Sequence, residues 1–308
     1  MSENRALEVR YWIHTVTPLH VGAGRGLGYI DLPIAREKVT NWPYVPGSSV
    51  KGVIADHYGA SSEETRKKEE NKMMRAAFGL PGSEGGDENS GGNAGALVFT
   101  DAHLLCLPVR SFYGTFAWIT SPFCLERFKR DMGKDVALPA KPDDNGARIA
   151  ASSVLTGGGP KIYLEDLDLS AARDAATEAL AGKIAASVFA DSPEWQTAFK
   201  ERFAVVDDDI FTFLCEAGTE VTPHIRINEK TGVVAKGALW YEESLPAETI
   251  LTGQVWCDKV YGVKDVTQAD LFESYCCGTQ FLQVGGKAST GKGQVRCVFE
   301  PFDQAGGR

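Results

Sequence analysis

The stretch LQVGGKASTGKGQVR, residues 282–296, places a glycine-rich loop between a predicted helix over 267–282 and a predicted final strand over 294–299. Glycines let backbone N–H groups approach a phosphate closely, and the two lysines supply positive charge. The loop lacks the G-x-x-x-x-G-K-[ST] order of a P-loop, and it follows a helix rather than the strand of a dinucleotide fingerprint. A plain flexible loop is the alternative. The residues predicted to contact phosphate are Gly285, Gly286, Lys287, Gly291, Lys292 and Gly293.

A second glycine-rich loop, TPLHVGAGRGLG (17–28), follows a strand predicted over 8–17. Its G-x-G-x-G spacing suggests a dinucleotide site, but Pro33 and the β-branched residues after it do not form the helix that such a site requires. Contact with backbone phosphate or sugar is more plausible. Asp31 comes next, in GYIDLPI, where a carboxylate beside a basic, glycine-rich surface would repel RNA unless it had a function. The alternative is a capping or solvated aspartate, the usual role of a lone loop aspartate.

Two further segments have features of nucleic-acid contact. VPGSSVKG (45–52) puts Ser48, Ser49 and Lys51 at the start of a predicted helix, where free N–H groups and the helix dipole attract phosphate. An ordinary capped helix is the alternative. The segment VTPHIRINEKTGVVAKGALWYEESLP (221–246) predicts a β-hairpin that turns at 229–232. A projecting hairpin can wedge apolar side chains between bases, whereas a hairpin packed within the domain would be structural.

The distribution of charge matters more than its sum. The chain has 308 residues and a net charge of −9, which at first argues against a nucleic-acid partner. Residues 165–209 hold eleven acids and four bases, whereas residues 274–299 hold three bases and no acid, so a local anion-binding face is permitted. No stretch resembles a membrane span or a signal peptide, and we expect a cytoplasmic protein. Seven cysteines without C-x-x-C, and histidines without zinc-ligand spacing, favour reduced thiols and no structural metal.

Strands and helices are mixed without steady βαβ alternation, which favours an α+β fold in one domain over 1–308. We expect a helical and flexible insertion over 59–95, a mainly helical insertion over 139–217 and the hairpin over 221–246. The remaining predicted helices cover 48–58, 61–78, 121–133, 171–190, 193–203 and 207–217. The remaining predicted strands cover 96–108, 113–119 and 248–258, and 139–160 is expected to be a long loop.

Taken together, these segments resemble one family. The runs H-V-G-x-G-x-G (20–26), DLPI-x-RE (31–37) and VPGSS-x-KG (45–52) resemble the N-terminus of RAMP-superfamily proteins. Three further runs, FTDAHLLCLPVRSFYGTFAWITSP (99–122), KGALWYEESLP (236–246) and the terminal glycine loop, resemble the backbone RAMP subunit of the Cmr complex in type III-B CRISPR systems. The resemblance implies a ferredoxin-like, RRM-type palm with inserted helices and a projecting β-hairpin thumb.

The resemblance also implies a function in antiviral defence. Copies of such a subunit stack along a guide RNA together with other Cmr-complex subunits, and each thumb interrupts the guide–target duplex. A loop aspartate then cuts the target RNA with Mg²⁺ or another divalent cation, and Asp31 occupies its place. The implied active-site support consists of His20, Glu242 and Glu243. His20 and Lys51 match family positions near RNA, and further candidates for RNA contact are Arg25, Arg110 and Arg226.

The expected reaction follows from the chemistry of RNA. The 2′-OH beside the scissile phosphate attacks in line, which gives a 2′,3′-cyclic phosphate and a 5′-OH. Asp31 would act as general base or as a ligand of Mg²⁺, and the sequence does not separate these roles. Two other functions stay open. One is a non-catalytic scaffold that binds guide RNA, and the other is a nucleotide-dependent enzyme, against which the incomplete phosphate-binding fingerprints argue.

Overall fold

The computed structural model describes residues 7–24, 26, 28–81, 92–132, 136–228 and 230–301. Its centre is an antiparallel sheet of β1 (Leu7–Thr15), β4 (Ala102–Arg110), β12 (Ile250–Cys257) and β14 (Gln294–Phe299), in the order β14-β1-β12-β4. Helix α1 (Gly47–His57) lies between the first two strands in the chain, and α8 (Gln268–Tyr275) between the last two. This β-α-β-β-α-β order is the ferredoxin-like arrangement, so the predicted fold class is confirmed.

Shorter elements surround this palm. The helix predicted over 61–78 is divided, because Lys68 takes an extended backbone (ψ 138°) between its parts. The prediction of a helix over 267–282 is wrong for the second half of that range. The helix ends at Tyr275, the chain turns at Gly278 (φ +63°), and the next residues alternate between exposed and buried as a strand beside β14. These elements are β2 (Tyr44–Val45), β3 (Val98–Phe99), β13 (Thr279–Gln283), α2 (Glu63–Lys67), η1 (Glu69–Asn71), α3 (Lys72–Phe78) and η2 (Ala288–Thr290).

The chain between β4 and β12 extends the sheet on one side. The three helices predicted within 139–217 are present, but four strands that the sequence did not predict lie there as well, one of them in the expected long loop over 139–160. In another of these strands, Lys161–Leu164, buried apolar residues alternate with exposed ones, which is a strand pattern. The helix predicted from 171 begins only at Ala175, where the Asp174 carboxylate accepts a hydrogen bond from Thr177 N at 2.8 Å. The extension contains β5 (Phe116–Thr120), α4 (Pro122–Met132), β6 (Gly146–Ile149), β7 (Lys161–Leu164), β8 (Leu167–Arg173), α5 (Ala175–Val188), α6 (Pro193–Arg202), β9 (Phe203–Val206) and α7 (Asp208–Ala217).

One hydrophobic core runs through the palm and this extension. The central strand β1 contributes Trp12, and α1 packs Ile54 against the sheet. In the extension, the centroids of the Trp118 and Phe199 rings lie 5.0 Å apart, and both residues are completely buried. The continuous core fixes the sheet, and the loops that leave its edge are therefore held in place. None of the helices in the described segments is long and apolar enough to cross a membrane.

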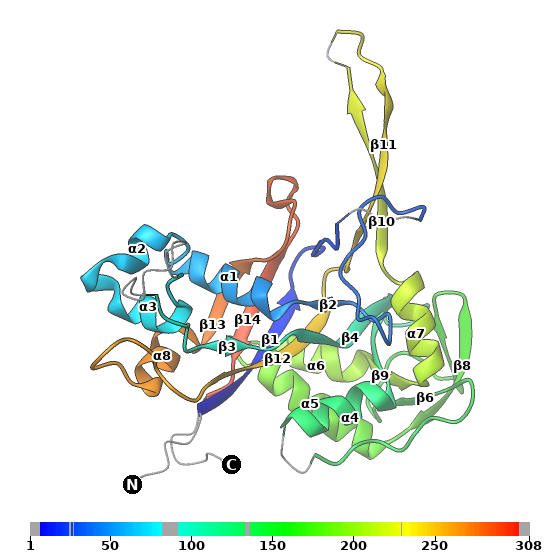
Figure 1. Cartoon of the computed structure of the whole chain (residues 1–308). Helices are drawn as coiled ribbons and strands as arrows, with labels where there is room; N and C mark the ends of the chain where they lie inside the picture. Colours follow the sequence, from blue (N-terminus) through cyan, green and yellow to red (C-terminus); the bar gives the residue numbers. More distant parts are fainter. Residues whose placement is uncertain are drawn as a thin grey trace.

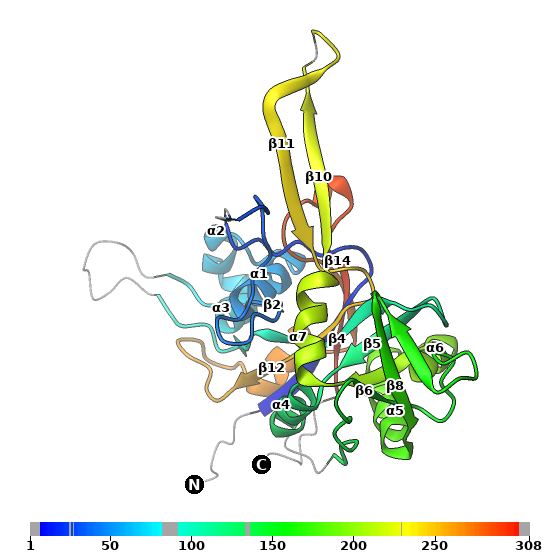
Figure 2. The same ribbon diagram turned by 90° about the vertical axis from the view of Figure 1, so that its right-hand side faces the viewer.

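A separate two-stranded sheet projects from the body. It consists of β10 (Glu220–Ile227) and β11 (Val234–Ser244), which lie within or at the edge of the range predicted for the hairpin. Figures 1 and 2 show it rising away from the palm in both views. Its outer part exposes apolar side chains, among them Ile227 at 58% and Val233 at 62%. Glu229 in the predicted turn lies outside the described residues. The hairpin is therefore available for contact with another molecule.

Candidate active site at the base of the hairpin

Three segments that are far apart in the sequence meet where the hairpin joins the body. They are the loop after β1, the end of β11 and the glycine loop between β13 and β14, which lie on the same side of the palm in Figure 1. Leu19 N donates to Leu245 O at 2.8 Å, and Leu32 N donates to Tyr241 O at 3.1 Å. Gly293 N donates to Pro18 O at 2.9 Å. Backbone hydrogen bonds thus fix the relative positions of all three segments.

Asp31 lies on the surface of this junction. Its Oδ2 accepts a hydrogen bond from Tyr241 N at 2.8 Å, and Gly26 N donates to its carbonyl at 3.0 Å. Gly26 is required there, because a Cβ would lie 2.3 Å from Ile30 O. The side chain is exposed, and Oδ1 has no hydrogen-bond donor within the described residues. One carboxylate oxygen is therefore held by the hairpin, and the other faces outward.

His20 is buried beneath the same junction. Its Nδ1 lies 2.6 Å from the carbonyl oxygen of Glu243. A carbonyl only accepts, so Nδ1 carries the proton and donates. Gly285 (φ +73°) packs against this residue so closely that a Cβ would lie 2.3 Å from His20 O. His20 therefore connects the two glycine loops to β11, and its predicted direct support of catalysis stays a prediction.

Glu242 forms a buried ionic cluster with the glycine loop. Only 1% of its side chain is exposed, and its two oxygens lie 2.9 Å from the ammonium groups of Lys287 and Lys292. Lys292 Nζ also donates to Ser244 Oγ at 2.8 Å. Burial raises the pKa of Glu242, but the two lysines outweigh this, and the pKa lies below its ordinary value. Two ammonium groups face one carboxylate, so the cluster carries a net positive charge beside the exposed loop.

Glu243 points to the opposite side of β11 and holds the Asp31 loop. Its Oε1 lies 2.5 Å from Arg36 Nη2, and its Oε2 accepts from Ile34 N at 3.0 Å. Thr219 Oγ1 donates to Oε1 at 3.0 Å. Since 3% of this carboxylate is exposed, its contacts are structural anchors of the loop. Both glutamates thus lie at the junction, but their side chains point to other groups than Asp31.

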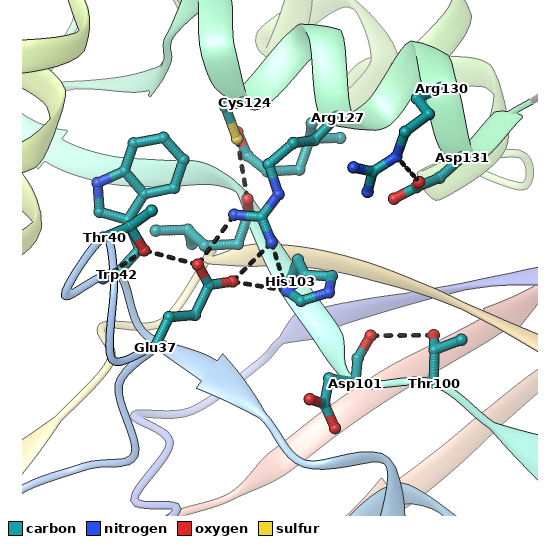
Figure 3. A network of polar contacts seen from close by, with 12 residues as sticks. Glu37, Thr40, Trp42, Thr100, Asp101, His103, Cys124, Arg127, Arg130 and Asp131 are labelled. Carbon is teal, nitrogen blue, oxygen red and sulfur yellow. Dashed lines mark hydrogen bonds and ion pairs between the residues drawn. The ribbon is translucent and has the colours of Figure 1, made fainter.

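A second anchor holds Glu37, the residue after Arg36 in the same loop (Figure 3). The Arg127 guanidinium donates to both oxygens of Glu37, at 2.9 and 2.7 Å, and His103 Nδ1 lies 2.6 Å from Oε1. Thr40 Oγ1 donates to Oε2 at 2.6 Å. Burial raises the pKa of Glu37, but the hydrogen bonds from His103, Arg127 and Thr40 outweigh it and lower the pKa to about 2. The loop is therefore tied to β4 and α4 as well as to the hairpin.

The helix N-terminus that was predicted to bind phosphate lies on the palm, and some of its donor groups already have partners within the chain. Helix α1 begins at Gly47, one residue before the predicted caps, and Gly47 N donates to Asp101 Oδ1 at 2.8 Å. Ser48 is exposed and Ser49 half-buried. Lys51 Nζ donates to Leu97 O at 2.9 Å, and burial, followed by the charge of Arg66, lowers its pKa. RNA contact by these residues stays a prediction.

The three arginine candidates lie in different places. Arg226 is exposed on β10, along the hairpin. Arg110 lies at the end of β4 and pairs with Glu165 at 3.2 Å, in the extension. Arg25 lies outside the described residues. The structure thus brings together Asp31, His20, Glu242, Glu243 and the glycine loop, whereas Arg110 belongs to a separate surface.

Sequence reasoning missed the groups that orient the catalytic candidate. Tyr241 acts through its backbone amide, which no residue type reveals, and Arg36 acts as an anchor within DLPIARE. The only sequence signal for these contacts was that the DLPI run (31–34) and the WYEE run (240–243) occur together in this chain. In the described segments, no three His, Cys, Asp or Glu side chains come together as ligands for a metal ion. The arrangement offers one oriented carboxylate beside a positively charged loop.

Comparisons with known proteins cover nearly the whole chain. A model of the RAMP superfamily matches residues 12–296. The CRISPR system Cmr endoribonuclease Cmr4 of Pyrococcus furiosus is 33% identical over 299 residues, which make up 96% of each chain. The crystal structure of oligomeric Cmr4 from P. furiosus matches with a TM-score of 0.66 and 24% identity, covering 96% of this chain and 98% of that chain. A chain of the type III-B Cmr-beta complex bound to cognate target RNA matches with a TM-score of 0.69 and 20% identity over 96% and 98%.

Proposed function

The chain belongs to the RAMP superfamily and, at 33% identity to Cmr4 over 96% of its length, we propose that it is the guide-RNA-binding backbone subunit of a type III-B CRISPR effector complex. In this role it is an endoribonuclease that cleaves target RNA at regular intervals, in antiviral defence. Its partners are guide RNA, target RNA, other Cmr subunits and further copies of itself. The support for the reaction is the name of the relative, and the oligomeric crystal structure of P. furiosus Cmr4 supports self-association.

The position of Asp31 carries the proposal for this chain. It is an exposed carboxylate, held by Tyr241 N at 2.8 Å, at the point where the hairpin meets the body. A loop aspartate whose only role is to contact solvent does not need such anchors. Here Glu243 and Glu37 fix the segment that follows Asp31, at residues 34–37, through buried or half-buried ion pairs. Such rigidity suits a group that must meet one phosphate in a defined geometry.

The proposed reaction is an internal transesterification. The 2′-oxygen of the nucleotide forms a bond to the adjacent phosphorus, and the bond from phosphorus to the 5′-oxygen breaks. Asp31 Oδ1 takes the proton of the 2′-OH, while Oδ2 stays bonded to the Tyr241 amide. The products are a 2′,3′-cyclic phosphate and a 5′-OH, whose oxygen takes a proton from solvent water as it leaves. A positioned general base contributes about 10²–10⁴-fold to such a step.

We also propose that a divalent cation takes part. Mg²⁺ is commonly held by one or two carboxylates together with substrate phosphates and water, so Asp31 Oδ1 fits, as the alternative to its role as a base, an ion that arrives with the RNA. The described residues offer no group of ligands that would hold the ion alone. When bound, the ion would stabilise negative charge on the phosphate oxygens.

The RNA path is proposed to cross the hairpin side of the palm. The cluster of two lysines and Glu242 has a net positive charge beside the glycine loop, and Lys287 remains 34% exposed. The exposed Ser48 and the half-buried Ser49 at the start of α1, together with Arg226 on β10, extend this surface. Contacts of this kind recognise the backbone of RNA without reading its sequence, as a subunit that accepts any guide requires.

The test is the variant Asp31→Asn in the assembled complex. Asparagine keeps the size and can still accept from Tyr241 N, but it cannot take a proton and is a poor ligand for Mg²⁺. We expect normal folding, assembly and target binding, with cleavage below about 1% of wild type at every regular site. Asp166→Asn, an exposed aspartate in the extension, is the matched control and should cut normally. If Asp31→Asn cuts at the wild-type rate with no other nuclease present, Asp31 has no catalytic role, and if the wild type does not cut under these conditions, the chain is the scaffold instead. EDTA should also stop the wild type if the ion is required.

A further inference from the structure

A cleft lies beside the Asp31 loop, on the side away from the glycine loop lysines. Its volume is about 410 Å³, within the size range of small-ligand sites. Asp31 does not line it, but Ile30 and Pro33 on either side of Asp31 do. The cleft is therefore within one residue of the proposed reacting carboxylate along the chain.

The walls of the cleft combine an aromatic ring with fixed polar groups. Tyr29 lines it and is 81% exposed, so the ring has a face free for stacking. On the opposite chain segments, Asn41 Nδ2 donates to Glu216 Oε1 at 2.7 Å, and Arg36 Nη1 donates to Asn41 O at 2.8 Å. Arg36 Nη2 also donates to Cys215 O at 3.1 Å. The polar wall is thus preorganised by the same arginine that anchors the Asp31 loop.

The charge of the cleft indicates whether it would bind a phosphate group or a nucleobase. Arg36 is its one cation among the described lining residues, and it is already paired with Glu243. Glu216 adds a second carboxylate, which leaves the cleft with a formal charge of −1 and disfavours a phosphate. Within the described chain, Asn41 Oδ1 and Glu216 Oε2 have no donor. These acceptors suit the Watson–Crick N–H donors that every RNA nucleobase carries, and the ring of the base would stack on Tyr29.

We propose that this cleft holds the target nucleobase that leaves the stack beside the scissile phosphate, with Tyr29 as its stacking platform. The inference rests on the proposed function. In-line attack by a 2′-OH requires a backbone geometry that a regular stacked helix does not have, so one flanking base must be displaced and held. Aromatic stacking accepts every base, which suits a site that must accept any target. Tyr29 is thereby a positioning residue for the reaction at Asp31.

The experiment uses the assembled complex with target RNA that carries 2-aminopurine at one displaced position. Fluorescence is measured in the Asp31→Asn background, so that no cutting is needed. We expect quenching by Tyr29, retained in Tyr29→Phe and lost in Tyr29→Ala. In the cutting-competent complex, Tyr29→Ala should slow cleavage about tenfold, as expected for one lost base–aromatic stack. An abasic target at that position should slow the wild type equally and Tyr29→Ala no further. Tyr261→Ala, an exposed tyrosine after β12, is the control and should change nothing.

Each outcome decides the assignment. Unchanged fluorescence and unchanged cleavage in Tyr29→Ala would overturn it. Additive effects of the abasic target and Tyr29→Ala would also overturn it, because the base would then bind elsewhere. Loss of assembly in Tyr29→Ala would identify the cleft as a contact between copies of the chain and overturn the nucleobase assignment. Cutting by Asp31→Asn would instead remove the catalytic role of Asp31 and leave the fluorescence result standing.

Discussion

Glu242 and Glu243 are neighbours in the chain but serve opposite sides of β11. Successive side chains of a strand point to opposite faces, so Glu242 meets the lysines of the glycine loop and Glu243 meets Arg36 of the Asp31 loop. Tyr241, the residue before Glu242, donates its backbone amide to Asp31. Three consecutive residues thereby connect the hairpin, the glycine loop and the catalytic candidate. A buried carboxylate without its partner is costly, which favours retention of both pairs.

The Glu37 anchor predicts a specific loss of stability in acid. The folded pKa of Glu37 is about 2, below the ordinary value of 4.5, so its contribution to the free energy of unfolding is complete above about pH 4.5. This contribution is lost as the pH falls from 4.5 through 2, and the shift corresponds to about 3 kcal/mol. Denaturant titrations between pH 7 and pH 3 should show more than half of this loss in the wild type.

Glu37→Gln is the variant that checks the assignment. Glutamine keeps a hydrogen-bond acceptor for Arg127 but does not titrate, so the variant should be less stable at pH 7 and lose less stability toward pH 3. Glu70→Gln, which lies in an exposed helical turn, should follow the wild type. Equal acid sensitivity of Glu37→Gln and the wild type would assign the loss to other carboxylates.

At the scale of elements, the hairpin has two functionally different parts. Its base holds Asp31, whereas its outer part contacts no core and exposes apolar residues such as Ile225. His224 and Trp240 face each other in the register, with stacked rings 5.6 Å apart, and mark the boundary between the parts. The outer part can therefore be removed without disturbing the anchors of the loop.

We predict that joining His224 to Trp240 through an Asn-Gly turn separates cutting from binding. Such a two-residue turn suits a tight hairpin. Thermal unfolding should stay near wild type and guide binding should lose no more than the contact of Arg226, whereas cleavage at the regular sites should fall at least tenfold because bases are no longer displaced. Cleavage products on a gel give the measurement. Normally spaced cuts by the shortened protein would remove the hairpin tip from the mechanism.

The elements show how far the sequence could be interpreted. Glycine spacing and capping patterns located α1, α4, α7 and both glycine loops, because these signals are local. The strand β6 was missed, since four residues with an internal arginine give no clear alternation. The pairing of Lys287 and Lys292 with Glu242 was also missed, because it depends on contacts across more than forty residues. The lysines were predicted to meet phosphate, and their internal partner emerges only from the tertiary structure.

At the scale of the whole molecule, the charges are segregated. The acidic stretch 165–209 contains β8, α5 and α6, which Figures 1 and 2 place in the body, away from the hairpin and the glycine loop. The net charge of −9 would repel RNA if it were spread evenly. Because the negative charge is concentrated on one part of the molecule, another face can attract a polyanion while the acidic part supports solubility.

This segregation predicts RNA binding and self-association that depend strongly on salt. In the proposed backbone role several copies share one guide, so light scattering should show multi-copy particles with guide-length RNA and smaller species without it. A plot of the logarithm of the RNA affinity against the logarithm of the salt concentration should have a slope of about −0.7 per phosphate contact.

Lys287→Ala should weaken RNA binding and make this slope shallower by about one phosphate contact, since Lys292 still pairs with Glu242. Lys161→Ala, whose ammonium pairs with Asp168 in the extension, should leave both unchanged. If Lys287→Ala lowers thermal stability but keeps the slope, this lysine serves only Glu242. A monomer indifferent to RNA at low salt would contradict the backbone role itself.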